Sequence, residues 1–354
     1  MNTKNKMDAL DAISSPQPQF SESAAKHMLA TEFGLEGELS PLVSERDQNF
    51  RVAMTDGRQF VFKIANCIEN SVTTDFQIKA LLHIEQRQCP IATPRIVRTL
   101  GGNDSALIYD GDVAHVCRVV SYLQGTLLSE LSMSPQLAKS LGEGAARLDL
   151  AMADFEHSGD SPQLLWDLQR AAGLRDLLPY IEDTALRAAV TACLDDFHTR
   201  VEPALPMLRR QVIHSDLHGD NVLADGDHQN AIVGVIDFGD MVRAPLIMEL
   251  AVAASYLRSG ESDTLSLIAP FVVAYNSLLP LQADELELLF DLVRTRLAAT
   301  ISILHWRVAQ RGEDDEYASL NWQGESDAEA FLLRLDSLGR SEFLSAISKS
   351  IKNS

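Results

Sequence analysis

Cysteine is scarce in this sequence, and long hydrophobic runs are absent. The four cysteines among 354 residues, Cys67, Cys89, Cys117 and Cys193, are widely spaced and form no Cys-x-x-Cys pair. This spacing excludes a disulfide-dense scaffold and a cysteine-rich zinc site. No window approaches the roughly 20 apolar residues that a membrane-spanning helix needs, and the N-terminus is polar. We therefore expect reduced cysteines and a cytoplasmic protein with no membrane partner.

Basic residues are also few: 30 Lys and Arg stand against 50 Asp and Glu, which gives a net charge of −20. A surface of that sign repels nucleic-acid backbones and anionic lipids, so we expect neither as a partner. A nucleotide site would need a local positive island made of lysine, backbone N–H groups or a divalent metal ion. The acidic surface suits a cationic small molecule, although solubility explains it equally well. No coiled-coil pattern indicates the oligomeric state.

The first third of the chain alternates between short β-like runs and two helical patterns. Residues 1–19 are polar and end in Ser-Ser-Pro-Gln-Pro, which predicts a flexible tail. Asp56-Gly57 lies between two of the β-like runs and predicts a two-residue hairpin turn, so an antiparallel meander is expected. The predicted strands are residues 39–43, 50–55, 59–65, 106–109 and 114–123, and the predicted helices are 25–33 and 72–88.

From residue 125 onward, long amphipathic helical patterns replace the strands. Only three short apolar runs interrupt them, at residues 211–214, 221–224 and 231–236. The change in pattern predicts an α+β protein with a lobe at 20–124, a small antiparallel sheet plus helix, and a larger, mainly helical lobe at 125–354. We expect the ligand to bind between the lobes.

The segment Val212-Ile-His-Ser-Asp-Leu-His-Gly-Asp-Asn-Val-Leu223 carries the clearest chemistry, together with Asp-Phe-Gly at residues 237–239. Transfer of a phosphoryl group to an alcohol needs a carboxylate at the attacking hydroxyl and metal ligands at the triphosphate. Asp216 is the candidate for the carboxylate. Asn221, five residues later, and Asp237 are candidate Mg²⁺ ligands, because both offer the hard oxygen atoms that this ion prefers.

These two motifs resemble those of the aminoglycoside phosphotransferase and choline kinase superfamily, over almost the whole chain. The sequence from His214 to Asn221 is similar to the family's His-x-Asp-x-x-x-x-Asn motif, followed by Asp-Phe-Gly. The resemblance implies a bilobal protein-kinase-like fold, ATP or GTP as phosphate donor, and Mg²⁺. It also implies that His214 braces the catalytic loop. A polar turn without catalytic role is the weaker alternative.

In the first lobe, Phe60-Val-Phe-Lys-Ile64 resembles the lysine-bearing third strand of kinases, so Lys63 is expected to contact the α and β phosphates. The family usually pairs this lysine with a helix glutamate. Gln77 stands at that place here and could accept a hydrogen bond more weakly than a charged partner would. This departure leaves the orientation of Lys63 open.

The Gly-x-Gly-x-x-Gly loop of protein kinases is missing between the first two predicted strands. Ser44-Glu-Arg-Asp-Gln-Asn49 occupies that loop, and Ser44 and Asn49 are candidate phosphate-covering residues; an ordinary hairpin loop is the equal alternative. Residues 116–125 resemble the interlobe hinge of the superfamily, where Ser121 and Leu123 would lie beside the base. A buried strand is the alternative there.

Two further segments resemble hydroxylysine kinases and the related kinase domains fused to aminotransferases. They are Phe155-Glu-His157 and Leu165-Trp-Asp-Leu168. This resemblance implies an alcohol on a small amine-bearing molecule as the acceptor. Packing and helix capping explain Trp166 and Asp167 equally well. Glu249 could hold a cationic substrate or fix the loop, and we favour the structural role.

Three other functions compete with this interpretation. His214, Asp216, His218 and Asp220 alternate as in a hydrolytic metal site, but no later ligand spacing completes one, and His218 by itself is better explained as a loop or core histidine. A bacterial stress-type protein Ser/Thr kinase is disfavoured because residues 240–249 leave no long activation loop. A regulatory pseudokinase is supported only by the non-acidic Gln77.

Overall fold

The computed structural model describes residues 17–44, 46–69, 71–226, 230–258, 263–311 and 316–354, and only the backbone within 311–326. Most of the expected tail, residues 1–16, therefore lies outside the described residues. The chain forms two compact units. The first comprises the residues up to Gln124 together with Phe155–Leu165, and the second comprises Gly125–Asp154 and Trp166–Ser354.

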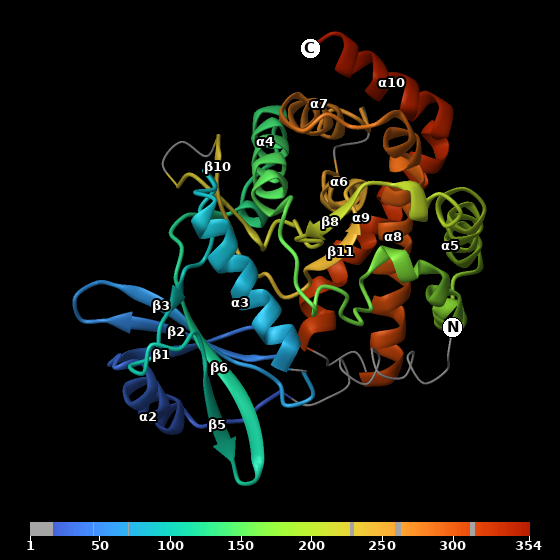
Figure 1. Cartoon of the computed structure of the whole chain (residues 1–354). Helices are drawn as coiled ribbons and strands as arrows, with labels where there is room; N and C mark the ends of the chain where they lie inside the picture. The colour runs from blue at the N-terminus through green and yellow to red at the C-terminus, as the bar shows by residue number, and fades with distance from the viewer. Residues whose placement is uncertain (1–16, 45, 70, 227–229, 259–262, 312–315) are drawn as a thin grey trace. The chain divides into compact units, whose positions relative to one another are not determined.

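The first unit is built on one antiparallel sheet (Figure 1). Its strands run in the order β1-β2-β3-β6-β4, and β5 also pairs with β6. The predicted meander of the first three strands is confirmed, whereas the two-residue β4 was not predicted because it is too short to show alternation. The strands are β1 (Gly37–Leu42), β2 (Gln48–Met54), β3 (Gln59–Ile64), β4 (Ile96–Val97), β5 (Ala106–Asp110) and β6 (Val113–Ser121), and the helices are α2 (Glu22–Phe33) and α3 (Ser71–Gln86).

Alternation along the strands separates an apolar face from a polar face. Phe62 and Ile64 of β3 are fully buried in a cluster with residues of α2, including Leu29 and Phe33. Lys63 lies between them in the sequence and therefore points to the opposite face, because successive strand side chains alternate. The core thus fixes the side of the sheet on which Lys63 lies.

The turn between β2 and β3 differs from the predicted two-residue turn. Met54 donates its N–H to the Arg58 carbonyl at 2.9 Å, so the loop consists of the three residues Thr55 to Gly57. Of the Asp56-Gly57 pair, only Gly57 has a positive φ, of 88°. A three-residue loop with glycine in the left-handed region is the next most common hairpin connection.

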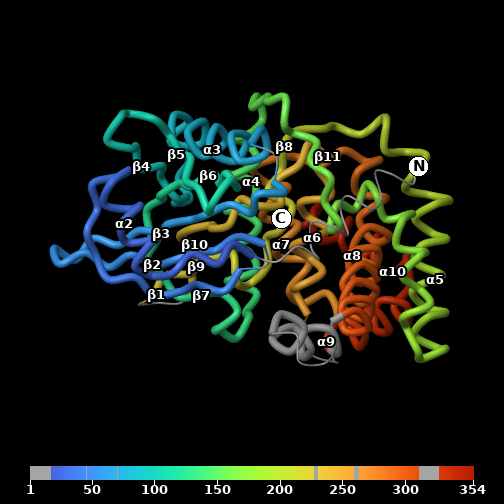
Figure 2. Tube along the Cα trace, turned by 90° about the horizontal axis from the view of Figure 1, so that it is seen from below, coloured from blue at the N-terminus to red at the C-terminus, as the bar shows by residue number. Residues whose placement is uncertain are grey.

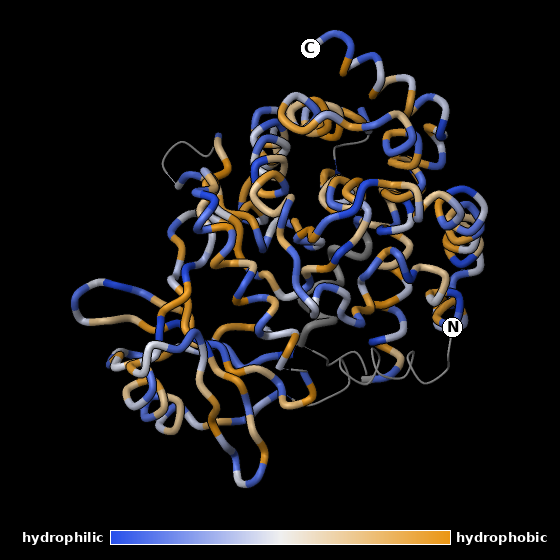
Figure 3. The backbone as a smooth tube through the Cα atoms, in the orientation of Figure 1, coloured by the Kyte–Doolittle hydropathy of each residue, from blue (hydrophilic) through white to orange (hydrophobic). Residues whose placement is uncertain are grey.

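The second unit is mainly helical, and the 29-residue α8 lies at its centre. It packs against α5, α6, α9 and the 3₁₀ helix η2, and in Figure 2 it runs between α6 and the pair α5 and α10. Figure 3 shows that α6 and much of α7 are apolar, as expected for helices buried on most sides. The helices are η1 (Leu128–Glu130), α4 (Pro135–Met152), η2 (Leu168–Tyr180), α5 (Thr184–Asp196), the π-helical turn η3 (Phe197–Val201), η4 (Leu205–Met207), α6 (Ile247–Ser255), α7 (Ile268–Leu278), α8 (Ala283–Arg311), α9 (Glu316–Leu338) and α10 (Arg340–Lys352).

Two small antiparallel sheets in the second unit hold the loops with the chemical motifs. One pairs β8 with β11, and the other has the order β10-β9-β7. The three apolar runs predicted near residues 211, 221 and 231 are confirmed as β8, β9 and β10. The bounds are β7 (Thr126–Leu127), β8 (Arg210–Ile213), β9 (Val222–Ala224), β10 (Ile232–Val235) and β11 (Val242–Pro245).

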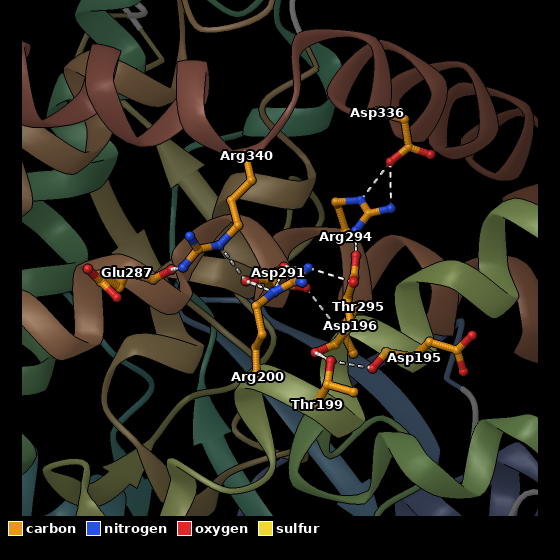
Figure 4. A network of polar contacts seen from close by, with 10 residues as sticks. All are labelled: Asp195, Asp196, Thr199, Arg200, Glu287, Asp291, Arg294, Thr295, Asp336 and Arg340. Carbon is orange, nitrogen blue, oxygen red and sulfur yellow. Dashed lines mark hydrogen bonds and ion pairs between the residues drawn. The ribbon is translucent and has the colours of Figure 1, made fainter.

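An ion-pair network joins the outer helices of this unit (Figure 4). Asp291 of α8 has a fully buried side chain and contacts Arg200 of η3 at 2.8 Å and Arg340 of α10 at 3.1 Å. One turn along α8, Arg294 contacts Asp196 at 2.5 Å and Asp336 of α9 at 2.6 Å. The two clusters link α8 to four other helical elements through charged side chains, and both partly exposed arginines of the Asp291 cluster keep some hydration.

These elements confirm the α+β class: an antiparallel sheet in the first part of the chain is followed by a mostly helical part. No helix among the described residues is long and apolar enough to cross a membrane.

Candidate active site

His214 follows β8 and anchors the loop that carries Asp216. Its ring is fully buried, its Nε2–H donates to the Ile236 carbonyl at 3.0 Å, and its Nδ1 accepts from the N–H of Asp216 at 3.3 Å. The ring meets the edge of Phe238, of the Asp-Phe-Gly segment, at 4.8 Å between centroids. Burial lowers the pKa of His214, which favours the neutral ring. These contacts tie His214 to the loop backbone, and its bracing role stays a prediction.

The carboxylate of Asp216 is approached by three nitrogen-bearing side chains. The Asn221 amide donates to it at 2.8 Å, His218 Nε2 lies 3.3 Å away, and Arg296 Nη2 donates from 3.2 Å. Burial alone would raise the pKa of Asp216, but the charges of His218 and Arg296 outweigh it and lower this pKa. Asp216 is therefore ionised at neutral pH and can accept a hydrogen bond from an alcohol.

Asn221 and Asp237 lie on adjoining segments, because the Ile236 N–H donates to the Asn221 carbonyl at 2.9 Å. The amide nitrogen of Asn221 is directed to Asp216, which leaves its amide oxygen as the atom it can offer to a cation. Asp237 is exposed, and one of its carboxylate oxygens accepts from the Gly239 N–H at 3.2 Å. Hard oxygen atoms from an amide and a carboxylate fit Mg²⁺, which keeps its other positions for phosphate and water.

Backbone strain and a buried glutamate shape the same loop. Ser215 and Asp237 have positive φ values of 65° and 55°, which residues other than glycine adopt at a cost. Glu249 of α6 accepts from the Ser215 N–H at 3.0 Å and is 1 % exposed. Burial raises the pKa of Glu249 to about 7, although the N–H groups of Ser215 and His214 oppose the shift. These contacts give Glu249 a loop-fixing position.

The hydrolytic metal site finds no support in this geometry. Both ring nitrogens of His214 are occupied by the loop backbone. Within the described part of the chain, no group of three His, Cys, Asp or Glu side chains could hold a metal ion in such a cage.

In the first unit, Lys63 lies in a row of polar residues across the sheet. The register places it opposite Asn49 of β2 and Arg118 of β6. Gln77 of α3 accepts from Arg118 at 2.5 Å and donates to Glu69 at 3.3 Å. Arg118, which the sequence did not single out, therefore holds the glutamine that stands in place of the usual glutamate.

The remaining predicted nucleotide-binding residues make local contacts. Ser44 Oγ accepts from the Asp47 N–H at 3.3 Å, which closes the β1–β2 loop. Ser121 Oγ accepts from the Arg95 N–H at 2.9 Å at the end of β6, and Leu123 follows in a half-exposed extended segment. Their roles toward a base or phosphate stay predictions.

Arg296, Tyr256 and Trp166 complete the surroundings of Asp216. Arg296 of α8 stacks over the Trp166 ring at 4.7 Å and donates to the Tyr256 hydroxyl at 3.2 Å. Arg296 was not predicted from the sequence, and His218 was expected to be a loop or core histidine. The available signal was an arginine inside the apolar α8 pattern, since buried arginines are rare without a partner. Asp167 caps η2 by accepting from the Gln169 N–H.

A family model, the phosphotransferase enzyme family, matches residues 38–285. The chain belongs to this family. It is a kinase of the aminoglycoside phosphotransferase type, with the protein-kinase-like fold that the sequence predicted. The relatives include the hydroxylysine kinase of Danio rerio, which is 28 % identical over 312 residues, 85 % of this chain and 88 % of the relative. The homoserine kinase of Methylobacillus flagellatus is 30 % identical over 58 % of this chain and 60 % of its own length.

Solved structures with the same fold include two small-molecule kinases. An aminopropanol kinase associated with microcompartments matches 92 % of this chain and 98 % of its own, with a TM-score of 0.66 and 18 % identity. The amicoumacin kinase hAmiN, in complex with AMP-PNP, Ca²⁺ and Ami, matches 93 % of this chain and 96 % of its own, with a TM-score of 0.65 and 16 % identity. Structural relatives of this small-molecule kinase thus bind ATP analogues and divalent cations.

Proposed function

We propose that this kinase transfers the γ-phosphate of ATP or GTP to the hydroxyl group of a small amine-bearing molecule of the hydroxylysine or amino-alcohol type. The carrying observation is Asp216, an ionised carboxylate held by the Asn221 amide at 2.8 Å beside the Asp-Phe-Gly segment. The kinases for hydroxylysine, homoserine and aminopropanol among its relatives support the acceptor class.

Each predicted residue has one role in this proposal. Asp216 orients the acceptor hydroxyl and accepts its proton late in the transfer, which its low pKa suits. His214 keeps the loop in place through its two ring nitrogens. Lys63 contacts the α and β phosphates, and Gln77, Ser44, Asn49, Ser121 and Leu123 are assigned to the nucleotide.

Asn221 and Asp237 hold Mg²⁺ in this proposal. The ion neutralises charge on the β and γ phosphates when it is bound. The residues themselves supply the amide oxygen and the exposed carboxylate described above, on two segments joined by the hydrogen bond between Ile236 and Asn221. We place the reaction in the cytoplasm, where the four free cysteines would stay reduced.

A protein Ser/Thr kinase is the second candidate, and the chain after Asp-Phe-Gly disfavours it. Residues 242–245 form β11 and residues 247–255 form the buried α6. The residues that would form an activation loop are thus buried in a strand and a helix. A pseudokinase is disfavoured because Lys63, Asp216, Asn221 and Asp237 are all present.

The test is nucleotide consumption with ATP and GTP in parallel, against hydroxylysine, homoserine, ethanolamine, aminopropanol, choline, aminoglycosides and a generic protein substrate. We expect Mg²⁺-dependent turnover with a small amine-bearing alcohol. Turnover of the protein substrate alone would replace the proposal with the second candidate. No nucleotide binding under any condition would contradict both.

A further inference from the structure

A charged group beside Asp216 has donor atoms without partners. The Arg296 side chain is only 2 % exposed, and its Nη2 is used by Asp216 and Tyr256. Within the described residues, its Nε and Nη1 are buried without any hydrogen-bond partner. A buried donor left without a partner costs roughly 1–3 kcal/mol, and more when it is charged. Such an arrangement at the reacting carboxylate therefore favours a ligand that supplies the missing acceptors.

The surroundings of Arg296 select the kind of ligand. One face of the guanidinium lies on the Trp166 ring at 4.7 Å, so hydrogen bonds can form only at its edges. A carboxylate matches such an edge with two parallel hydrogen bonds. The ammonium group of an amino alcohol has only donors and would be repelled.

A second arginine adds positive charge near Arg296. The Arg258 guanidinium lies over the Tyr256 ring, 5.3 Å from its centroid. Burial lowers the pKa of Arg258, and the charges of Arg296 and Arg334 add to this effect, whereas Tyr256 and Asp327 oppose it. The negative charges of Asp216 and Asp240 stabilise the charged guanidinium of Arg296. A chain of net charge −20 thus gathers arginines near its candidate catalytic carboxylate, where an anion would gain most.

We propose that Arg296, over Trp166 and beside Tyr256, binds a carboxylate of the acceptor, so that the substrate is a hydroxy amino acid rather than an amino alcohol. The inference rests on the proposed function, because Asp216 is taken to hold the acceptor hydroxyl. Trp166 and Tyr256, which cover the guanidinium, are both partly exposed, so Arg296 lies one side chain away from solvent.

The test uses pairs of acceptors that differ only by the carboxylate. These are homoserine and 3-aminopropan-1-ol, threonine and 1-aminopropan-2-ol, and hydroxylysine and 1,5-diaminopentan-2-ol. With the full-length protein, Mg²⁺ and ATP, we expect kcat/KM to be about 100-fold higher for the carboxylated member of the pair that is turned over, because hydrogen bonds to charged groups are individually strong. Equal values, or a preference for the decarboxylated member, would overturn the inference.

The same pairs are titrated into the protein with AMP-PNP, and Trp fluorescence reports binding. Tighter binding of a carboxylated member without phosphorylation would keep the inference and contradict the proposed reaction. Phosphorylation with no carboxylate preference would keep the proposed reaction and contradict the inference. If no member of any pair binds, the inference fails.

Arg296→Lys separates substrate binding from the positioning of Asp216. We expect the ratio of kcat/KM values within a pair to fall about tenfold or more, mainly through KM of the carboxylated member. Arg294→Lys is the control, since Arg294 is a buried arginine of the same helix that pairs with Asp196 and Asp336 instead, and it should leave the ratio unchanged.

A drop in kcat that is equal for both members would make Arg296 a positioning residue only. Trp166→Leu covers the case in which Arg296→Lys does not fold, because Trp166 is half-exposed. It should raise KM of the carboxylated member about fivefold by removing the stacked ring. An unchanged ratio in both variants would sink the inference.

Discussion

Asp216 shows how a short loop gives one carboxylate a defined charge. The aspartate is partly buried, with 20 % of its side chain exposed, yet its pKa is lowered because His218 and Arg296 stand at 3.3 and 3.2 Å. Asn221 donates a further hydrogen bond. The residue is thus ready to orient a hydroxyl but is a weak base before the transfer begins.

Replacing Asp216 by alanine should lower kcat by about two orders of magnitude or more and leave nucleotide affinity within a few-fold, because the carboxylate acts on the acceptor. Steady-state kinetics and a nucleotide titration measure both. Asp220→Ala is the matched control: its carboxylate is 61 % exposed in the same loop, so activity should stay within a few-fold. Normal turnover of Asp216→Ala would remove Asp216 from the mechanism.

Glu249 is expected to make stability depend on pH. Burial raises its pKa to about 7 from 4.5, so the folded state holds the proton more tightly than the unfolded state. Its contribution is present at low pH and declines as the pH rises from about 4.5 to 7. Asp149, whose pKa burial and Glu249 also raise, acts in the same direction.

Glu249→Gln removes this titration and still offers an oxygen to the Ser215 N–H. As the pH is raised from 5.5 to 8, the natural protein should lose the Glu249 contribution and the variant should not. The unfolding free energy of the variant minus that of the natural protein should therefore increase by about 2 kcal/mol. Urea unfolding at both pH values measures the change, with the exposed Glu342→Gln of α10 as control. A pH-independent difference would show that Glu249 does not titrate in this range.

The site residues that sequence could predict are those whose contacts are local in the chain. Asp216 and Asn221 are five residues apart and do form a hydrogen bond. Arg296 reaches Asp216 across 80 residues, and nothing in a single sequence reports which turn of α8 faces that loop. The partner of Gln77 was missed for the same reason, because Arg118 comes from a strand 41 residues later.

At the scale of elements, α4 and α7 approach each other at Gly142. A Cβ atom built on this glycine would lie 2.1 Å from the carbonyl oxygen of Phe271. Because a backbone atom blocks the position, the helices would have to separate.

Gly142→Ala should therefore lower the unfolding free energy by about 3 kcal/mol, toward the upper end for an overpacked core. Gly173→Ala is the control, since its added methyl group would meet no atom within 4 Å, and we expect little change. Thermal or urea unfolding of the two variants measures the contrast. Equal stability of both would mean that α4 and α7 can shift at low cost.

The predicted helices and strands agree with the structure where the hydrophobic periodicity extends over many residues. The pattern at residues 72–88 became α3, and 114–123 became β6. β7 is two residues long and gave no alternation. The sequence pattern places Phe155 in the second lobe, whereas Phe155 stacks on Phe76 of α3 at 5.9 Å within the first unit. Local propensity does not encode such a tertiary contact.

At the scale of the whole molecule, bound nucleotide should raise stability in a metal-dependent way. ATP analogue at about 100 times its Kd stabilises a folded protein by about 2.7 kcal/mol. In thermal-shift measurements we expect most of this gain to disappear with EDTA, because the proposed ligands Asn221 and Asp237 would then hold no cation.

In Asp237→Ala, the nucleotide should stabilise the protein only slightly even with Mg²⁺ present, as it does for the natural protein in EDTA. The same titration without metal is the control. An unchanged Mg²⁺ dependence in Asp237→Ala would exclude this carboxylate as a ligand.

Because residues 155–165 belong to the first unit, the design of hybrid proteins from two such kinases is constrained. The chain passes from one unit to the other at residues 124–125, 154–155 and 165–166. A hybrid that joins the first 124 residues of one relative to the remainder of another would therefore supply the surroundings of Phe76 from two parents, mismatching the Phe155 stack and the 3.0 Å contact between His157 and Asp75. An exchange of the second unit accordingly calls for three junctions, with the 155–165 segment kept with its own sheet.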